Sequence, residues 1–222
     1  MKTKTKYPVH TYSVLEEQLN VWSHFFGLLL SIGGLILLIF RGLELKSDRA
    51  LLSFSIFGVS MTILYLASTL YHSSKNPLLR YRLNIFDHAA IYVLIAGTYS
   101  PFALVSLNGR EGHIIFAVVW SIAIIGIVFK IFFTGRFDIL STILYVGMGW
   151  LIIFSFKSLM YNLDFQGLVW LIAGGISYTL GAVLYSIHKL KFHHFIFHLF
   201  VLLGTFCHFV AIYFYVIPVS SI

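Results

Sequence analysis

The sequence has few charged residues. Asp, Glu, Lys and Arg make up only 10% of its 222 residues, whereas 59% are hydrophobic and the mean hydropathy is +0.91. In a soluble domain about one quarter of the residues are charged, so this chain has too few charged side chains to cover a water-facing surface. Long apolar runs between short polar breaks are typical of a polytopic helical membrane protein. We therefore assign the formal charge of +7 to loops, and we expect membrane lipids, and no nucleic acid, as partners.

Cysteine is also scarce. The single residue, Cys207, excludes an intrachain disulfide and any CxxC metal or redox site. No spacer is long enough to hold a second domain, which predicts one membrane domain over residues 1–222. The basic start "MKTKTKYPVH" precedes an apolar run over Val21–Phe40 without a small-x-small cleavage pattern. We interpret this run as a retained first helix rather than a signal peptide.

Seven apolar segments are long enough to cross a bilayer, which predicts an all-α, integral membrane bundle of seven transmembrane helices. The predicted spans are 20–41, 50–73, 85–107, 113–133, 138–160, 167–187 and 193–217.

Basic residues between the spans predict the orientation. With a cytoplasmic N-terminus and an outside C-terminus, ten of the fifteen basic residues lie inside, as expected for a multi-pass protein of the cell membrane. The ten are Lys2, Lys4, Lys6, Lys75, Arg80, Arg82, Lys130, Arg136, Lys189 and Lys191.

Polar side chains gather at one predicted depth. The cytoplasmic ends of the second, third and seventh spans carry imidazoles and a carboxylate: His72, Asp87, His88, His193, His194 and His198. Three helices therefore bring ionisable groups to the same side of the bilayer, and such intramembrane groups indicate function.

The spacing of two histidines favours a metal site. His194 and His198 are about 400° of rotation and roughly 6 Å apart on a helix, so their rings share one face. His72 can supply a third nitrogen, and three neutral imidazoles predict an open tetrahedral site for Zn²⁺. Asp87 is expected to bind the ion directly or to hold a water beside it. Ser68 lies one turn before His72 and is expected to bond that ligand or water.

Plainer interpretations stand beside this one. A membrane serine commonly bonds a backbone carbonyl, and a membrane histidine commonly makes one interhelical hydrogen bond or lies at the interface. One of these two roles is expected for the histidines at segment edges, His113, His188 and His193. His24 and His208 are expected to line a polar cavity or to contact one other helix. Haem b on two facing helices is the alternative cofactor, although two histidines on one helix favour a small ion.

Four stretches carry a family resemblance: "EEQLNVWSHFFG" (Glu16–Gly27), "STLYHSS" (Ser68–Ser74), "FDHAAIYVLIAGTYSPF" (Phe86–Phe102) and "HHFIFHLFVLLGTFCHF" (His193–Phe209). They resemble the bacterial hemolysin III family, prokaryotic relatives of the adiponectin and progestin receptors. The resemblance extends over all seven spans, with the S-x-x-x-H, aspartate and H-x-x-x-H elements in the family's order.

The resemblance implies a seven-helix fold with a cytoplasmic N-terminus and a zinc ion near the cytoplasmic face. By motif, the family's zinc histidines correspond to His72, His194 and His198. The aspartate that holds the zinc's water corresponds to Asp87, and the motif serine to Ser68. The similar alkaline ceramidases suggest hydrolysis of a lipid amide. The chain lacks the receptors' long N-terminal extension, so no soluble hormone is expected as a partner.

Three functions are compatible with these features. The first is a zinc-dependent hydrolase of a lipid amide or ester at the cytoplasmic side of the bilayer. The second is a non-enzymatic lipid sensor or regulator of membrane lipid composition. The third is a pore-forming hemolysin, which ranks last because a secreted toxin has to hide its apolar surface before insertion.

Overall fold

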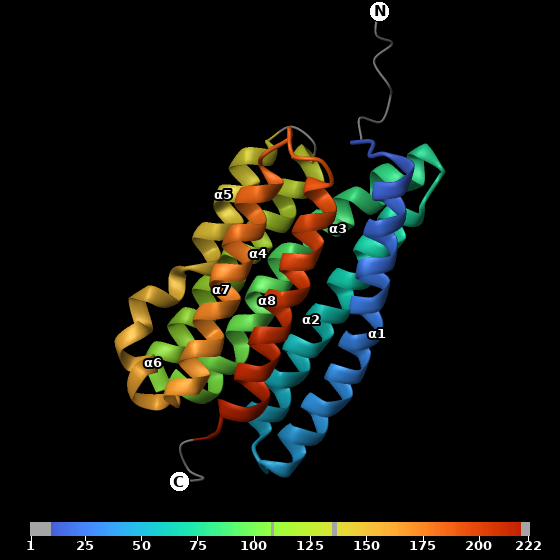
Figure 1. Ribbon diagram of the computed structural model, residues 1–222. Coiled ribbons are helices and arrows are strands. Elements are labelled where there is room, and N and C mark those ends of the chain that lie inside the picture. Colours follow the sequence, from blue (N-terminus) through green and yellow to red (C-terminus); the bar gives the residue numbers. More distant parts are fainter. Residues whose placement is uncertain (1–9, 108, 135–136, 219–222) are drawn as a thin grey trace, which may run out of the picture.

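The computed structural model describes residues 10–107, 109–134 and 137–218, which form a bundle of helices (Figure 1). Lys2, Lys4, Lys6 and Arg136, which contribute to the predicted orientation, lie outside the described residues. The elements are α1 (Val14–Glu44), α2 (Asp48–Ser73), α3 (Pro77–Pro101), a π-helical turn (Phe102–Leu107), α4 (Gly109–Phe133), α5 (Asp138–Gly149), a 3₁₀ turn (Leu151–Ser155), α6 (Phe156–Asn162), α7 (Phe165–Tyr185) and α8 (His193–Tyr215).

Seven of the described segments are long and apolar enough to cross a membrane, as predicted, and the described residues contain no strand. One end of the bundle is called here the N-terminal end, because α1, α3, α5 and α8 begin there while α2, α4 and α7 finish there (Figure 1). The described chain leaves the bundle at the opposite end (Figure 1). The polar ends of α2, α3 and α8 were predicted to share one depth. The structure places all three at the N-terminal end of the bundle.

Two helices begin earlier in the sequence than the predicted spans. α1 begins at Val14 rather than 20, because the Ser13 hydroxyl accepts the N–H of Glu16 at 3.2 Å. α3 begins at Pro77 rather than 85, with Asn76 as its N-cap. Hydropathy registers only the apolar part of a helix, so it missed these polar first turns. The added turn of α1 carries side chains of the candidate site.

The fifth span is interrupted near its middle. α5 ends at Gly149 and a 3₁₀ turn follows before α6, so backbone groups at membrane depth lose their helical partners. The Tyr99 hydroxyl of α3 compensates: it donates to the carbonyls of Met148 and Gly149 at 3.0 and 2.8 Å and accepts the N–H of Ile152 at 2.8 Å. Irregular backbone in a bilayer requires such partners inside the protein.

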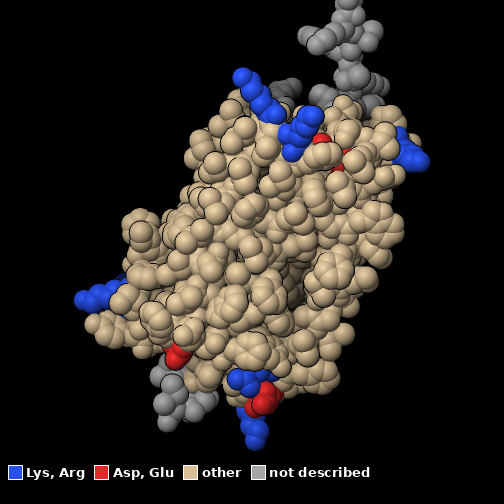
Figure 2. All heavy atoms as spheres, viewed as in Figure 1, with Lys and Arg blue, Asp and Glu red and all other residues tan. Residues whose placement is uncertain are grey.

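The surface of the bundle matches a lipid environment. Figure 2 shows Lys, Arg, Asp and Glu near the two ends of the molecule, with a broad uncharged band between them. Many large apolar side chains are exposed, such as Phe40, Ile125 and Phe132 at 66%, 69% and 70%. Apolar exposure on this scale is stable in hydrocarbon and unstable in water. The chain is therefore a multi-pass membrane protein.

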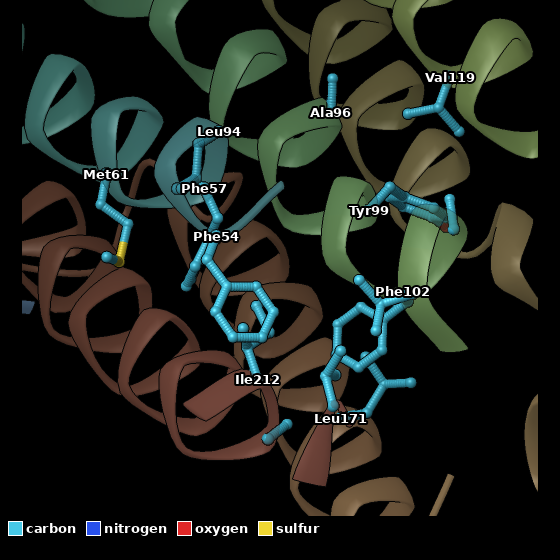
Figure 3. Packing of buried hydrophobic residues seen from close by; sticks show 14 of the residues in the cluster. Phe54, Phe57, Met61, Leu94, Ala96, Tyr99, Phe102, Val119, Leu171 and Ile212 are labelled. Atoms are coloured by element: carbon cyan, nitrogen blue, oxygen red, sulfur yellow. The ribbon is translucent and has the colours of Figure 1, made fainter. Parts of the chain in front are cut away.

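The core lies around α3. In the span that α3 forms with the following π-helical turn, 78% of the most apolar stretch is buried, the highest share among the seven spans. Phe54 and Phe57 of α2 pack toward Leu94 of α3, while Phe102 lies near Leu171 of α7 (Figure 3). α1 packs on α2, and α8 contacts both α1 and α7. The ends of α1, α2, α3 and α8 thus meet around one volume at the N-terminal end.

Replacing Tyr99 by Phe should destabilise the bundle. The change removes the hydroxyl that serves three backbone groups of the interrupted span, and leaving such groups unsatisfied costs about 1–3 kcal/mol. Unfolding of the purified protein in mixed micelles measures the loss. Tyr161→Phe, at an 80% exposed tyrosine, is the matched control. Equal stability of the two variants would contradict this role.

Candidate metal centre

Three histidines from two helices meet at the N-terminal end of the bundle. His72 lies in the last turn of α2, and His194 and His198 lie in the first turns of α8. All three are buried, and each offers one ring nitrogen such that these atoms lie within 4.8 Å of one another. The Nε2 atoms of His72 and His194 are only 3.0 Å apart. The structure thus brings together the three side chains predicted as metal ligands.

The start of α8 is held by α1. Phe192, the residue before α8, adopts the left-handed conformation (φ 59°) and provides no side-chain cap. The carboxylate of Glu16, itself buried, instead accepts the backbone N–H of His194 at 3.3 Å. A negative charge at a helix N-terminus is favourable because it pairs with exposed N–H groups and the helix dipole. This contact fixes where the first turn of α8, with its histidines, begins.

Nδ1 of each histidine has a hydrogen-bonding partner. The Glu17 carboxylate lies 2.8 Å from Nδ1 of His72. The hydroxyls of Ser23 and Tyr12 lie 3.1 Å from Nδ1 of His198 and 3.0 Å from Nδ1 of His194. The three Nδ1 atoms therefore point outward to hydrogen-bonding groups. In metal sites the non-ligating nitrogen of a histidine is usually bonded in this way.

The pair of facing Nε2 atoms fits a cation. The Glu17 carboxylate forms an ion pair with Arg80 and is therefore ionised. An ionised carboxylate can only accept hydrogen bonds, so Nδ1 of His72, which bonds it, carries a proton. A neutral His72 then directs the lone pair of Nε2 at His194, 3.0 Å away. Two imidazole nitrogens on one tetrahedral zinc are about 3.3 Å apart, from zinc–nitrogen distances of ~2.0–2.1 Å. The donor set and its spacing fit a metal ion.

Asp87 and Ser68 lie beside the histidines but are not part of the metal-sized group. Asp87 of α3 and Ser68 of α2 are buried, and both line a cavity that also borders His194 and His198. The Ser68 hydroxyl makes no hydrogen bond of normal geometry with the described residues. The arrangement provides a carboxyl group and a hydroxyl group at the cavity wall. Their predicted roles remain predictions.

The cavity has a volume of about 140 Å³ and extends from the histidines toward the middle of the bundle. Its wall is largely apolar, with polar groups at intervals. The polar lining residues are His24, Ser68, Asp87, His88, Thr98, Tyr99, Lys130, Ser141, Thr142, Tyr145, Tyr178, Thr179, Tyr185, His194, His198 and His208. A chamber of this kind can accept an apolar chain with a polar head near the histidines.

Sequence reasoning missed most of the α1 side of the site. His24 stacks on His198 with ring centroids 3.5 Å apart and planes 7° apart. The buried polar residues Glu16, Asn20 and His24 follow one another at four-residue intervals, which places them on one face of α1. This spacing is the signal that identifies an inward polar face. Lys130 of α4, 1% exposed at the cavity wall, gave no such signal because it was counted as a loop charge.

The remaining histidines lie at the bundle surface, at the cavity wall or between helices. His113 and His188 are exposed. His208 lines the cavity, and its Nε2 donates to the carbonyl of Leu171 at 3.1 Å. His193, expected either at the interface or in a contact with another helix, is buried. The rings of Tyr12 and Tyr185 pack around it, with centroids 5.9 and 5.7 Å away.

Comparison with known proteins agrees with this architecture. The family model described as Haemolysin-III related matches residues 12–209. This range begins at Tyr12, whose hydroxyl bonds His194, and ends one residue after His208. The chain belongs to the Haemolysin-III related family. The match includes α1, α2, α3 and α8, the helices that build the histidine group.

Two bacterial relatives match nearly the whole chain, and a human relative matches a shorter part of it. Hemolysin-3 of Bacillus cereus is 47% identical over 211 residues, 95% of this chain and 96% of that protein. The Hemolysin-3 homolog of Bacillus subtilis (strain 168) is 47% identical over 208 residues, 94% of this chain and 98% of that protein. The human monocyte to macrophage differentiation factor is 31% identical over 170 residues, 72% of this chain and 68% of that protein.

The histidine group should bind one divalent metal ion per chain. Removing one ligand by His194→Ala leaves two imidazoles, so the purified variant should retain far less metal than the wild type after equilibration with trace zinc. Elemental analysis of the protein in detergent measures the ratio. His113→Ala, at an exposed histidine of α4, is the matched control and should keep one equivalent. A full equivalent in His194→Ala would contradict the assignment.

Proposed function

We propose that this protein is a zinc-dependent hydrolase that acts on a lipid amide or ester within the bilayer. The observation that carries the proposal is the convergence of three buried imidazoles, two of which, His194 and His198, line a largely apolar cavity. Histidine nitrogens suit zinc, and three protein ligands leave a position open for reaction. A bound zinc ion supplies Lewis-acid chemistry: it polarises a carbonyl and lowers the pKa of water toward 7.

The protein's own residues perform the other steps. The apolar wall of the cavity holds the acyl chain and excludes bulk water, which strengthens polar interactions at the reacting carbonyl. A carboxylate oxygen of Asp87 takes a proton from the attacking water and delivers it to the leaving nitrogen or oxygen. The water oxygen bonds to the acyl carbon while the carbon–nitrogen or carbon–oxygen bond breaks. The products are a fatty acid and an amine or alcohol.

Ser68 is assigned a supporting role. Its hydroxyl lines the cavity with Asp87 and makes no hydrogen bond of normal geometry with the described residues. The hydroxyl interacts with the Asp87 side chain. It can donate to the Asp87 carboxylate or to the substrate carbonyl, and either bond orients the reacting groups.

The proposed location is the cell membrane, with the N-terminal end of the bundle facing the cytoplasm. The excess of basic residues on that side supports this orientation. The histidines then lie near the cytoplasmic face, where a substrate enters from the inner leaflet. The proposal treats residues 1–222 as one membrane domain, with membrane lipids rather than nucleic acid or a soluble hormone as partners.

A lipid sensor is the second candidate. The largely apolar cavity favours it, because such a chamber can hold an acyl chain without turnover. In this case the metal would be structural. Stoichiometric acyl-chain binding by a zinc-loaded protein that releases no amine or alcohol would favour the sensor over the hydrolase.

Pore formation and haem binding rank lower. The name Hemolysin-3 of the Bacillus relatives refers to lysis, and dye release from liposomes at low protein density would support that function here. Against haem, the 3.0 Å between Nε2 of His72 and Nε2 of His194 leaves no space for a porphyrin plane between them. The spacing supports a single small ion.

The hydrolase proposal predicts that Asp87→Asn binds zinc normally and turns over slowly. The amide keeps the shape of the side chain but cannot accept a proton, so kcat should fall about 10²–10⁴-fold. Release of fatty acid from ceramide-type amides and from acyl esters in mixed micelles measures this. Asp164→Asn, at the N-cap of α7, is the control because Asn caps a helix equally well. Unchanged turnover in Asp87→Asn would overturn the assigned role.

A further inference from the structure

We propose that Tyr12, Glu17 and Ser23 are positioning residues that aim the Nε2 atoms of all three histidines at the metal. These residues are called here the orienting residues. They lie just before α1 or on its first turns, and each bonds Nδ1 of a different histidine, at 3.0, 2.8 and 3.1 Å. The inference rests on the proposed metal site. It goes beyond that site because residues that do not bind the metal determine which ring nitrogen of each histidine faces it.

The first contact fixes His72. Arg80 of α3 pairs with one oxygen of Glu17, and His72 bonds the other at 2.8 Å. Arg80 also lies 3.4, 3.5 and 3.4 Å from the carbonyls of Tyr71, His72 and Ser74 at the end of α2. One guanidinium therefore joins the orienting carboxylate to the backbone of the ligand that it orients. Rotation of the His72 ring would break a charge-assisted bond.

The second contact fixes His198. The Ser23 hydroxyl donates its single proton to the carbonyl of Asn20 at 3.1 Å. With that proton on the carbonyl, the hydroxyl oxygen accepts from Nδ1 of His198, 3.1 Å away. The ring consequently carries its proton on Nδ1 and leaves Nε2 with a lone pair. The parallel His24 ring, 3.5 Å from the His198 ring, keeps its plane fixed.

The third contact fixes His194. The phenol of Tyr12 carries a proton at neutral pH, as tyrosine ordinarily does, and its hydroxyl also hydrogen-bonds Tyr185. A phenol that donates toward Tyr185 leaves its oxygen free to accept from Nδ1 of His194, 3.0 Å away. Nε2 of His194 then faces Nε2 of His72.

The three contacts have a joint consequence. With protons on all three Nδ1 atoms, three Nε2 lone pairs converge in a buried site of low dielectric, where their mutual repulsion is strong. A divalent cation relieves this repulsion. The orienting residues therefore prepare the site for metal before the metal arrives, and their loss should weaken binding although none of them touches the ion.

Metal affinity tests the proposal. Tyr12→Phe, Glu17→Gln and Ser23→Ala should each weaken zinc binding by about 10–100-fold, the usual effect of losing a group that bonds a ligand histidine. Competition with a chromogenic chelator measures the dissociation constant. The visible d–d spectrum of the Co²⁺-loaded protein should also change, because rotated imidazoles alter the ligand field. Ser23→Thr retains the hydroxyl and should restore both readouts.

Matched controls separate this role from general instability. Glu44→Gln, 68% exposed at the far end of α1, and Tyr161→Phe, 80% exposed, should bind zinc like the wild type. Unfolding of the metal-free variants shows whether each one is folded. A wild type that binds no metal would refute the metal site itself. If the wild type binds zinc and all three folded variants keep its zinc affinity and its cobalt spectrum, only the positioning role is refuted.

Discussion

The arrangement depends on keeping three imidazoles together in a medium that does not hydrate them. His72 and His194 face each other across 3.0 Å, and His198 completes the group. In a bilayer interior, unpaired polar groups of this kind are unfavourable by several kcal/mol unless they find partners. Hydrogen bonds to the outer nitrogens and a cation between the inner ones satisfy both sides of the rings. The first turns of α1 provide the outer bonds, which explains why this helix extends beyond its apolar run.

The rest of the bundle serves the same constraint at a larger scale. The middle of the protein is apolar inside and outside, so any departure from regular helix needs an internal partner. Tyr99 provides one for the interrupted fifth span, and Glu16 provides one for the uncapped start of α8. Several other buried hydroxyls, such as those of Ser53, Ser60 and Ser100, bond carbonyls of their own helix. The chamber next to the histidines is largely apolar, which supports the proposed action on lipids.

Much of the fold and part of the site could be predicted from the sequence. The seven spans follow from apolar length, and the HxxxH spacing on α8 identifies two side chains on one face. The depth argument correctly brought His72 to them. Hydropathy could not detect Tyr12 or Glu17, because they lie before α1 or in its polar first turn, and Ser23 is a single serine within the apolar run. The role of all three appears only when α1 packs against α2 and α8. The break after Gly149 was also hidden, since residues on both sides of it are equally apolar.

X-ray absorption of the zinc-loaded wild-type protein tests the central claim most directly, because it reports the atoms bound to the metal. The account predicts three imidazole nitrogens at about 2.0–2.1 Å and one further light ligand, with no sulfur. A spectrum dominated by oxygen ligands, by a sulfur shell near ~2.3 Å, or by fewer than three imidazoles would contradict it.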